Sequence, residues 1–357
     1  MSQLLPEKSI KLGEHVISKD SSVYIVAEMS ANHLGDYNRA LEIVHAAKEA
    51  GADAIKLQTY TADTMTIDSD KSYFQIEGGT LWDGTTLYKL YKEAYMPWEW
   101  HQGIMDEAKK VGIDCFSSPF DKTAVDLMMG LDMPAIKIAS YEITDIPFIR
   151  YCASQHKPII FATGVARESD IKLAVDTCLQ EGNGDIILLK CVSAYPTPYE
   201  EVNLNMIPTL AEKFGCVMGL SDHTMGGAVA EAAVALGARM VEKHLTLRRS
   251  DGGADGAFSM EPEEFALMVK NIRIIEKALG RSEYFLSEKQ EKEREGARSL
   301  YVVQDIAKGE VLTDTNIRSI RPQQGAGLPP FMYEQVLGKR AKTDLYRGEP
   351  LKEGDFE

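Results

Sequence analysis

Two apolar runs each end in a histidine: Val217-Met218-Gly219-Leu220-Ser221-Asp222-His223 and Arg239-Met240-Val241-Glu242-Lys243-His244. Residues 226–237 between them fit a helix, so this stretch predicts two parallel strands joined by a crossover helix. Both imidazoles would then emerge at the same end of neighbouring strands. The pair indicates either a divalent metal site with open coordination positions or two histidines that only cap their loops.

The same rhythm of strand and helix extends outward over most of the chain. Helices are legible at 38–50, 168–181 and 261–279, and several strands are apolar throughout, as parallel strands covered by helices are. This alternation predicts an α/β fold, a closed (β/α)8 TIM barrel. We expect its strands at 23–28, 54–59, 114–118, 135–140, 158–163, 185–193, 216–221 and 240–246.

Two segments depart from the rhythm. A long insert at 60–97 follows the second strand and either covers the mouth of the barrel or packs on itself. Beyond the last barrel helix, short strand-like runs punctuated by Gly and Pro predict a small β-rich domain. We therefore divide the chain into a barrel at 1–280, a charged helical linker at 281–297 and a second domain at 298–357.

Composition limits the classes of function. At 357 residues, 44% hydrophobic and 26% charged, the chain has the make-up of an ordinary globular protein. Its net charge of −15 argues against nucleic acid or an anionic membrane as partner, because either would need a basic face. The five cysteines show no paired spacing and are interpreted as reduced core residues. Because residues 1–8 contain no apolar signal core, we expect a cytoplasmic protein.

Polar residues lie where a barrel builds its active site, at the carboxyl ends of the strands. Lys56 and Lys137 are embedded in apolar strands, where a lysine needs an anionic partner. That partner is either a bound phosphate and carboxylate or an interior glutamate such as Glu142 or Glu242. Hydroxyl groups that would assist an anion site are those of Ser117, Ser118, Ser140, Thr163 and Ser221, and Gln58 and Ser193 lie at the same strand ends.

Two further carboxylates have positions that suit chemistry. Glu28 ends the first strand and is either a general acid/base, a partner for a sugar hydroxyl or a structural partner of Lys56. Asp255 lies in the glycine-rich loop after the eighth strand. It either contacts substrate or a metal-bound water, or only shapes the turn.

The chain resembles the sialic acid synthase family over essentially its whole length, and its tail resembles the SAF (antifreeze-like) domain of these synthases. The motifs that carry the resemblance are Ala27-Glu28-Met29-Ser30-Ala31-Asn32-His33, Lys56-Leu57-Gln58-Thr59, Phe116-Ser117-Ser118-Pro119-Phe120-Asp121, Lys137-Ile138-Ala139-Ser140, Tyr195-Pro196-Thr197-Pro198, Gly219-Leu220-Ser221-Asp222-His223-Thr224 and Glu242-Lys243-His244.

The resemblance implies condensation of phosphoenolpyruvate with a free amino-sugar aldehyde to give a nine-carbon 2-keto acid and phosphate. It implies a divalent metal at His223 and His244, Mn2+ first, with Mg2+ or Co2+ as alternatives. It also implies a domain-swapped homodimer in which Arg321 of one subunit reaches the active site of the other. Phosphoenolpyruvate would be held by Lys56, Ser118, Lys137, Ser140, Ser193 and Ser221, and the sugar would face Glu28, Glu242, Tyr195 and Asp255.

Some motifs look most like the branch of the family that uses a diacetamido trideoxy hexose. Among them are Gly78-Gly79-Thr80-Leu81-Trp82-Asp83-Gly84 and Leu351-Lys352-Glu353-Gly354-Asp355-Phe356. Ser193 stands where the N-acetylneuraminate branch has Asn, which argues against N-acetylmannosamine as substrate. We expect the more apolar trideoxy sugar to pack against Trp82, Tyr88 and Trp98 of the insert.

Two other classes of function fit part of the pattern. Interior lysines such as Lys56, Lys137 and Lys190 also occur in Schiff-base aldolases, where they form imines with carbonyl substrates. A barrel that binds a sugar or a metal without catalysing a reaction is the other alternative. Trapping with borohydride would support the aldolase, whereas release of phosphate from phosphoenolpyruvate would exclude both.

Overall fold

The computed structural model describes residues 8–77, 79, 81–323 and 327–357. Gly78 and Thr80 of the insert motif, and residues 1–7 and 324–326, lie outside the described residues. The chain divides after Gly280 into two compact units, each described by itself below. In the described part, no helix combines the length and apolar character needed to cross a membrane.

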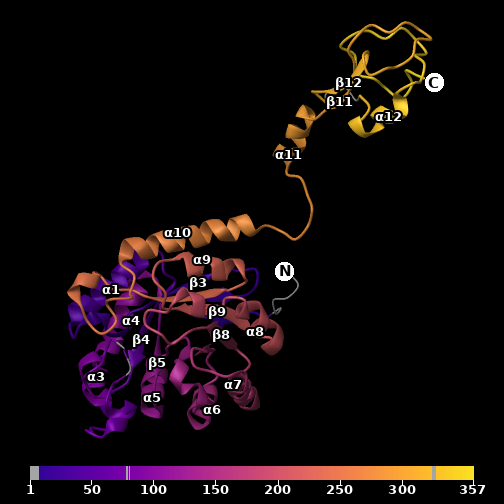
Figure 1. Ribbon diagram of the computed structural model, residues 1–357. Helices are drawn as coiled ribbons and strands as arrows, with labels where there is room; N and C mark the ends of the chain where they lie inside the picture. The colour runs from indigo at the N-terminus through magenta and orange to yellow at the C-terminus, as the bar shows by residue number, and fades with distance from the viewer. Residues whose placement is uncertain (1–7, 78, 80, 324–326) are drawn as a thin grey trace. The chain divides into compact units, whose positions relative to one another are not determined.

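The first unit is a closed barrel of eight parallel strands, as predicted (Figure 1). Its strands run in the order β10-β3-β4-β5-β6-β7-β8-β9 around the barrel, so first and last strands pair. The sixth strand ends at Lys190 rather than at 193, because the hydroxyl of Thr197 binds the carbonyls of Val192 and Ala194 and shapes a loop there. The strands are β3 Tyr24–Glu28, β4 Ala54–Thr59, β5 Asp114–Pro119, β6 Ile136–Ile138, β7 Ile159–Ala162, β8 Ile186–Lys190, β9 Val217–Asp222 and β10 Met240–His244.

Helices surround the barrel and bury their apolar stripes against the outer face of its sheet. Aspartates cap several of them; Asp36, for example, accepts hydrogen bonds from the first turn of α1. Glycines in the left-handed conformation end others, such as Gly112 after α4. The helices are α1 Tyr37–Glu49, α4 Trp100–Val111, α5 Lys122–Gly130, α6 Ile146–Ala153, α7 Glu168–Gln180, α8 Met206–Phe214, α9 Ala228–Ala235 and α10 Pro262–Leu279. Short 3-10 turns lie at Ser30–His33, Ser140–Thr144, Tyr199–Glu201 and Arg249–Asp251.

A hairpin that the sequence did not predict closes the amino end of the barrel. Strands β1 Ile10–Leu12 and β2 His15–Ile17 pair in antiparallel fashion ahead of the first barrel strand. Their buried side chains join one apolar cluster with interior residues from the amino ends of the barrel strands, including Tyr24 and Phe116. The interior at this end is therefore filled, and the polar residues gather at the opposite, carboxyl end.

The insert between β4 and α4 forms its own small helices, α2 Ala62–Met65, the 3-10 turn Ser72–Phe74 and α3 Leu87–Ala94. The hydroxyl of Thr86 caps α3 by accepting the amide hydrogen of Lys89. Contacts join α2 to α3 within the insert.

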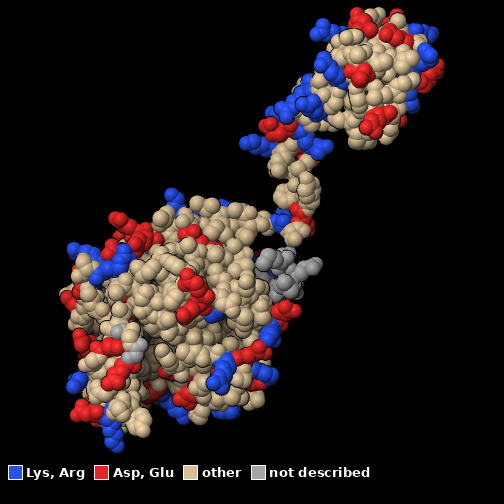
Figure 2. Space-filling view, in the orientation of Figure 1, with Lys and Arg blue, Asp and Glu red and all other residues tan. Residues whose placement is uncertain are grey.

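The second unit combines short strands with turns, as expected for a SAF domain. Antiparallel strands β11 Ser299–Val302 and β12 Ile317–Ile320 pair, and the helices are α11 Glu288–Glu293 and α12 Tyr333–Val336, with 3-10 turns at Arg294–Gly296 and Pro330–Met332. A separate apolar cluster that includes Leu300, Ile306 and Leu351 forms its core. Figure 2 shows that acidic and basic side chains are interspersed on the visible surface of both units.

Candidate active site

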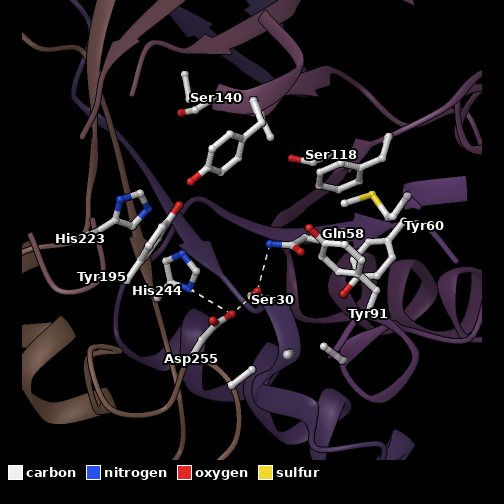
Figure 3. A pocket seen from close by; sticks show the side chains of 18 of the residues that line it. Ser30, Gln58, Tyr60, Tyr91, Ser118, Ser140, Tyr195, His223, His244 and Asp255 are labelled. Carbon is white, nitrogen blue, oxygen red and sulfur yellow. Dashed lines mark hydrogen bonds and ion pairs between the residues drawn. The ribbon is translucent and has the colours of Figure 1, made fainter. Parts of the chain in front are cut away.

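A cavity of about 540 Å³ opens at the carboxyl ends of the barrel strands. Polar side chains from β4, β5, β6, β9 and β10 line its floor. Figure 3 shows His223, His244 and Tyr195 on one side of this cavity and Tyr60 and Tyr91 on the other. The predicted residues that line it are Lys56, Gln58, Ser118, Lys137, Ser140, Tyr195, Ser221, His223, Glu242, His244 and Asp255.

Four buried charges form one ion-paired cluster, and three of them, Lys56, Lys137 and Glu242, lie in the floor of the cavity. The ammonium of Lys56 lies 2.7 Å from the Glu28 carboxylate and 3.2 Å from the Glu242 carboxylate. Lys137 lies 3.7 Å from the same Glu242 oxygen. The pairing of the interior lysines with glutamates is therefore confirmed, and both lysines also line the open cavity, where binding of an anion stays a prediction. Glu28 itself lies behind Lys56, outside the cavity lining.

Burial and the mutual charges of Glu242, Glu28, Lys56 and Lys137 shift the pKa values within this cluster. Burial alone would raise the pKa of Glu242, but the charges of Lys137 and Lys56 outweigh burial and lower this pKa to about 2. Burial raises the pKa of Glu28 to about 7, with Lys56 opposing the shift and Glu242 adding to it. For Lys56, burial would lower the pKa, but Glu242 and Glu28 raise it, so this lysine stays protonated at neutral pH.

Hydroxyl groups surround the lysines. Ser118 accepts a hydrogen bond from Lys56 at 3.4 Å, and Ser221 donates one to Glu242 at 3.0 Å. Ser140 accepts the backbone amide hydrogen of Gly164 at 3.1 Å. Ser118 and Ser221 thus contact the charged side chains, and all three serines line the open cavity.

Two predicted hydroxyls have other surroundings. Thr163 lies outside the lining, because its hydroxyl donates to the backbone carbonyl of Leu189 at 3.0 Å. Ser193 lies beside Gly164 and outside the cavity lining, and its buried Oγ makes no hydrogen bond of normal length among the residues that the structure describes. A buried hydroxyl without a partner is costly unless a ligand or water satisfies it.

The two histidines lie together with atoms free for a ligand. Their ring centroids are 5.3 Å apart, and Nδ1 of His223 donates to the carbonyl of Val192 at 2.9 Å, which leaves its Nε2 as an acceptor. Nδ1 of His244 is buried and unpaired within the described ranges, at 3.9 Å from the Asp255 carboxylate. Burial, then the charge of His223, lowers the pKa of His244 well below its usual range, which favours the neutral imidazole that binds metals.

This donor set fits a divalent cation that keeps open positions. Across the described chain, no three His, Cys, Asp or Glu side chains are grouped closely enough to hold a metal ion, so Asp255 does not complete a set of three ligands with the two histidines. Two imidazoles with a nearby carboxylate would leave several positions for water or substrate, as catalytic rather than structural sites do.

A fully buried ion pair lies behind the histidines and fixes the strands that carry them. Lys243, next to His244, donates to the Asp222 carboxylate at 2.7 Å and to the carbonyl of Thr224 at 2.7 Å. Asp222 precedes His223 and also accepts the amide hydrogen of Thr224 at 2.9 Å. The pair thus ties the ends of β9 and β10 together next to both imidazoles.

A hydrogen-bonded chain leads from Glu28 to Asp255, and Figure 3 shows its part from Gln58 through Ser30 to Asp255. The amide of Gln58 donates to Glu28 at 3.0 Å and to the Ser30 hydroxyl at 2.9 Å, and Ser30 donates to Asp255. This chain orients the Asp255 carboxylate towards the cavity beside His244. Asp255 therefore lines the cavity and does not only shape its turn.

Aromatic side chains form the wall beside the histidines. The ring of Tyr195 lies 4.4 Å from the ring of His223, and Trp82 lies 5.7 Å from Tyr195. The indole of Trp82 also donates to the carbonyl of Ala254 at 3.0 Å, next to Asp255. Phe258, which sequence reasoning missed, packs 4.9 Å from His244.

Tyr88 and Trp98 do not lie where they were expected, against the sugar-binding cavity. Tyr88 donates to Asp63 at 3.2 Å and Trp98 donates to the carbonyl of Tyr60 at 3.1 Å, and both lie outside the cavity lining. The insert residues that line the cavity are Tyr60, Met65, Ile76, Trp82, Leu87, Leu90, Tyr91 and Ala94. Helical spacing along 87–94 was the signal that could have identified Leu87, Leu90, Tyr91 and Ala94 among these residues.

Two further residues, Cys191 and Arg321, have positions that the sequence did not specify. Cys191 was interpreted as a core residue, yet it lines the cavity, with Sγ 3.9 Å from Nδ1 of His223. It directly follows β8, so its position at a strand end was the available signal. Arg321 is exposed in the second unit.

Comparison with known proteins gives consistent results. The NeuB family model matches residues 43–284, more than half of the chain, and the SAF domain model matches residues 297–357. The chain is 48% identical to a pseudaminic acid synthase of Campylobacter jejuni, covering 94% of this chain and 97% of the relative. It is 46% identical to the pseudaminic acid synthase of Helicobacter pylori, covering 93% and 97%.

More distant relatives show the same architecture. An N,N'-diacetyllegionaminic acid synthase of Legionella pneumophila is 36% identical, covering 92% of this chain and 93% of the relative. The crystal structure of an N-acetylneuraminic acid synthetase from Leptospira borgpetersenii superposes with a TM-score of 0.73 at 30% identity, covering 81% of this chain and 96% of that one.

Proposed function

This chain belongs to the NeuB family, the sialic acid synthases that its motifs resemble, and from that membership we propose that it is a pseudaminic acid synthase. It would condense phosphoenolpyruvate with 2,4-diacetamido-2,4,6-trideoxy-β-L-altropyranose and release pseudaminic acid and phosphate. The observation that carries this proposal is the higher identity to two pseudaminic acid synthases, 48% and 46%, than to the legionaminic relative, 36%.

The floor of the cavity supports binding of phosphoenolpyruvate. Lys56, Lys137 and the hydroxyls of Ser118, Ser140 and Ser221 face it and would donate charge-assisted hydrogen bonds to phosphate and carboxylate oxygens. The buried Oγ of Ser193 would gain the partner that it lacks among the described residues.

The charges of this floor indicate that further cations take part. Two lysines and two glutamates share the ion-paired cluster, so their charges cancel when all four are ionised. A polyanionic substrate would therefore need additional positive charge. A divalent cation at His223 and His244, Mn2+ first and Mg2+ or Co2+ as alternatives, would supply two of these charges and would polarise the sugar aldehyde as a Lewis acid.

The reaction can be written with its atoms balanced. C3 of phosphoenolpyruvate bonds to the aldehyde carbon of the open-chain sugar, whose oxygen takes a proton and becomes a hydroxyl. Water adds its oxygen to C2, and the resulting tetrahedral carbon expels phosphate with the bridging oxygen, which leaves the 2-keto acid. Tyr195 and Asp255 flank the histidines and would position the sugar, while Glu242 holds both lysines in the floor.

We further propose a domain-swapped homodimer in the cytoplasm. The SAF domain of each subunit would bring its Arg321 to the active site of the other, adding the remaining positive charge beside phosphoenolpyruvate. Five free cysteines, all buried, support a reducing compartment.

The test is a panel of open-chain hexoses incubated with phosphoenolpyruvate, followed by phosphate release and product mass. Turnover restricted to the altro-configured trideoxy sugar supports the proposal. Preference for the legionaminic precursor or for N-acetylmannosamine would assign the chain to one of those branches instead. EDTA should abolish activity and Mn2+ should restore it, whereas a borohydride-trapped imine with a keto acid would support an aldolase.

A further inference from the structure

The helix α3 of the insert presents an apolar stripe to the cavity instead of to a core. Leu87, Leu90, Tyr91 and Ala94, at the spacing i, i+3, i+4 and i+7, all line the cavity. All residues of α3 stay at least partly exposed, so neighbouring protein segments cover this stripe only in part. An apolar helix face that borders a cavity is satisfied when a ligand covers it.

Neighbouring residues continue this surface. Met65 from α2 and Ile76 from the loop before α3 line the same cavity, and Phe120 adds a ring from the end of β5. Tyr60 packs edge-on against Tyr91 at 5.8 Å and against Phe120 at 5.4 Å, which joins α3 to the barrel. We define this surface as the α3 wall.

The α3 wall lies across the cavity from the histidines. In Figure 3, Tyr91 and Tyr60 lie on the side opposite His223, His244 and Tyr195. The floor between the two sides carries the ion-paired lysines and glutamates. A sugar whose aldehyde is held beside the histidines therefore extends its far end towards the α3 wall.

We infer that the α3 wall selects the sugar by its apolar far end, binding the C6 methyl group and the adjacent acetamido methyl group. This inference rests on the proposed function. A methyl group in an apolar pocket contributes about 0.8 kcal/mol per buried carbon. A hydroxyl at C6 would lose its hydrogen bonds to water, and only the phenol groups of Tyr60 and Tyr91 could replace them in this wall. The class of substrate is thus a 6-deoxy, acetamido-rich hexose.

The test replaces one residue of the wall and measures steady-state kinetics by phosphate release. Leu90→Ser should raise the KM for the trideoxy sugar about tenfold or more, the range that one methylene contact gives. The KM for phosphoenolpyruvate and the melting temperature should stay unchanged. Activity towards the matching sugar with a hydroxyl at C6 should fall less, so that discrimination between the two sugars decreases.

Controls separate the possible failures. Leu173→Ser changes an exposed leucine of α7 and should leave the KM for both sugars unchanged. Ala94→Leu places a larger side chain in the space beside the α3 wall and should also weaken binding of the trideoxy sugar. Because the two variants change different residues, a folding defect in one of them would not decide the result. If the wild type turns over the trideoxy sugar and both wall variants keep its KM, the inference is overturned while the proposed function stands. If the wild type releases phosphate with none of the hexoses, both the inference about the α3 wall and the proposed function are overturned.

Discussion

Gly164 is the residue whose replacement tests the predicted phosphoenolpyruvate site most directly. A Cβ atom at this position would lie 2.2 Å from Oγ of Ser193, 2.7 Å from Oγ of Ser140 and 2.9 Å from the backbone nitrogen of Ser193. Real Cβ atoms do not approach other atoms so closely, and one of the three contacts is with backbone. Gly164→Ala therefore forces the two serines apart.

The expected magnitude has two parts. Overpacking of this kind costs about 1–3 kcal/mol of folding free energy. If the shift breaks one charge-assisted hydrogen bond from Ser140 or Ser193 to the substrate, the loss is about 1.5–3 kcal/mol, which corresponds to an increase of about 10- to 150-fold in the KM for phosphoenolpyruvate. The KM for the sugar should change little, because the proposed role of Ser140 and Ser193 is to bind phosphoenolpyruvate.

The assay combines initial-rate kinetics, varying each substrate in turn, with urea denaturation. Gly130→Ala provides the matched control, because a Cβ there meets no atom within 4 Å and the residue ends helix α5. This control should keep wild-type kinetics and gain up to about 1 kcal/mol of stability from the better helix former. A Gly164→Ala enzyme with a wild-type KM for phosphoenolpyruvate would refute the placement of that substrate beside Ser140 and Ser193.

Three further outcomes are expected. Burial raises the pKa of Glu142 to about 7, above its unfolded value, so its contribution to stability is complete below about pH 4.5 and is lost as the pH rises through 7; Glu142→Gln should remove up to about 3 kcal/mol of this pH dependence in urea unfolding at pH 5 and pH 8. Glu242→Gln leaves Lys56 and Lys137 buried with one carboxylate fewer and should cost about 3–5 kcal/mol of unfolding free energy, and a loss below 1 kcal/mol would contradict the shared ion pair. Trp82→Phe keeps an aromatic side chain but removes the hydrogen bond from the indole to the loop after β10, which is worth about 0.5–1.5 kcal/mol. Limited proteolysis of that loop should therefore become faster. Equal cleavage rates would show that the hydrogen bond does not hold the loop.

The barrel was predictable because its information is local. Each strand is a short apolar run and each helix has a legible stripe and cap, so residues such as Asp36 and Gly112 mark helix ends without knowledge of the rest of the chain. The hairpin that closes the amino end was missed, since two strands of three residues give too weak a pattern. Its role depends on contacts with strands far along the chain.

The candidate site was predictable in its membership more than in its arrangement. The carboxyl ends of parallel strands meet at one face of the barrel, so Lys56, Lys137, His223 and His244 were expected together, and all four line one cavity. The hydroxyl of Thr163 turned out to bind a backbone carbonyl instead, because a strand-end position does not fix the rotamer of a side chain.

The sequence by itself therefore determined the eight alternating strands and helices, a small β-rich second domain and the polar residues at the strand ends, because periodicity is a property of neighbouring residues. The identification of the second domain as a SAF domain came from the resemblance of its motifs. Only the tertiary structure decided that Glu242 serves both Lys56 and Lys137, and that the apolar stripe of α3 faces the cavity. Those relations join residues from distant segments across the closed barrel. They arise from barrel closure and from the packing of the insert, which no local pattern records.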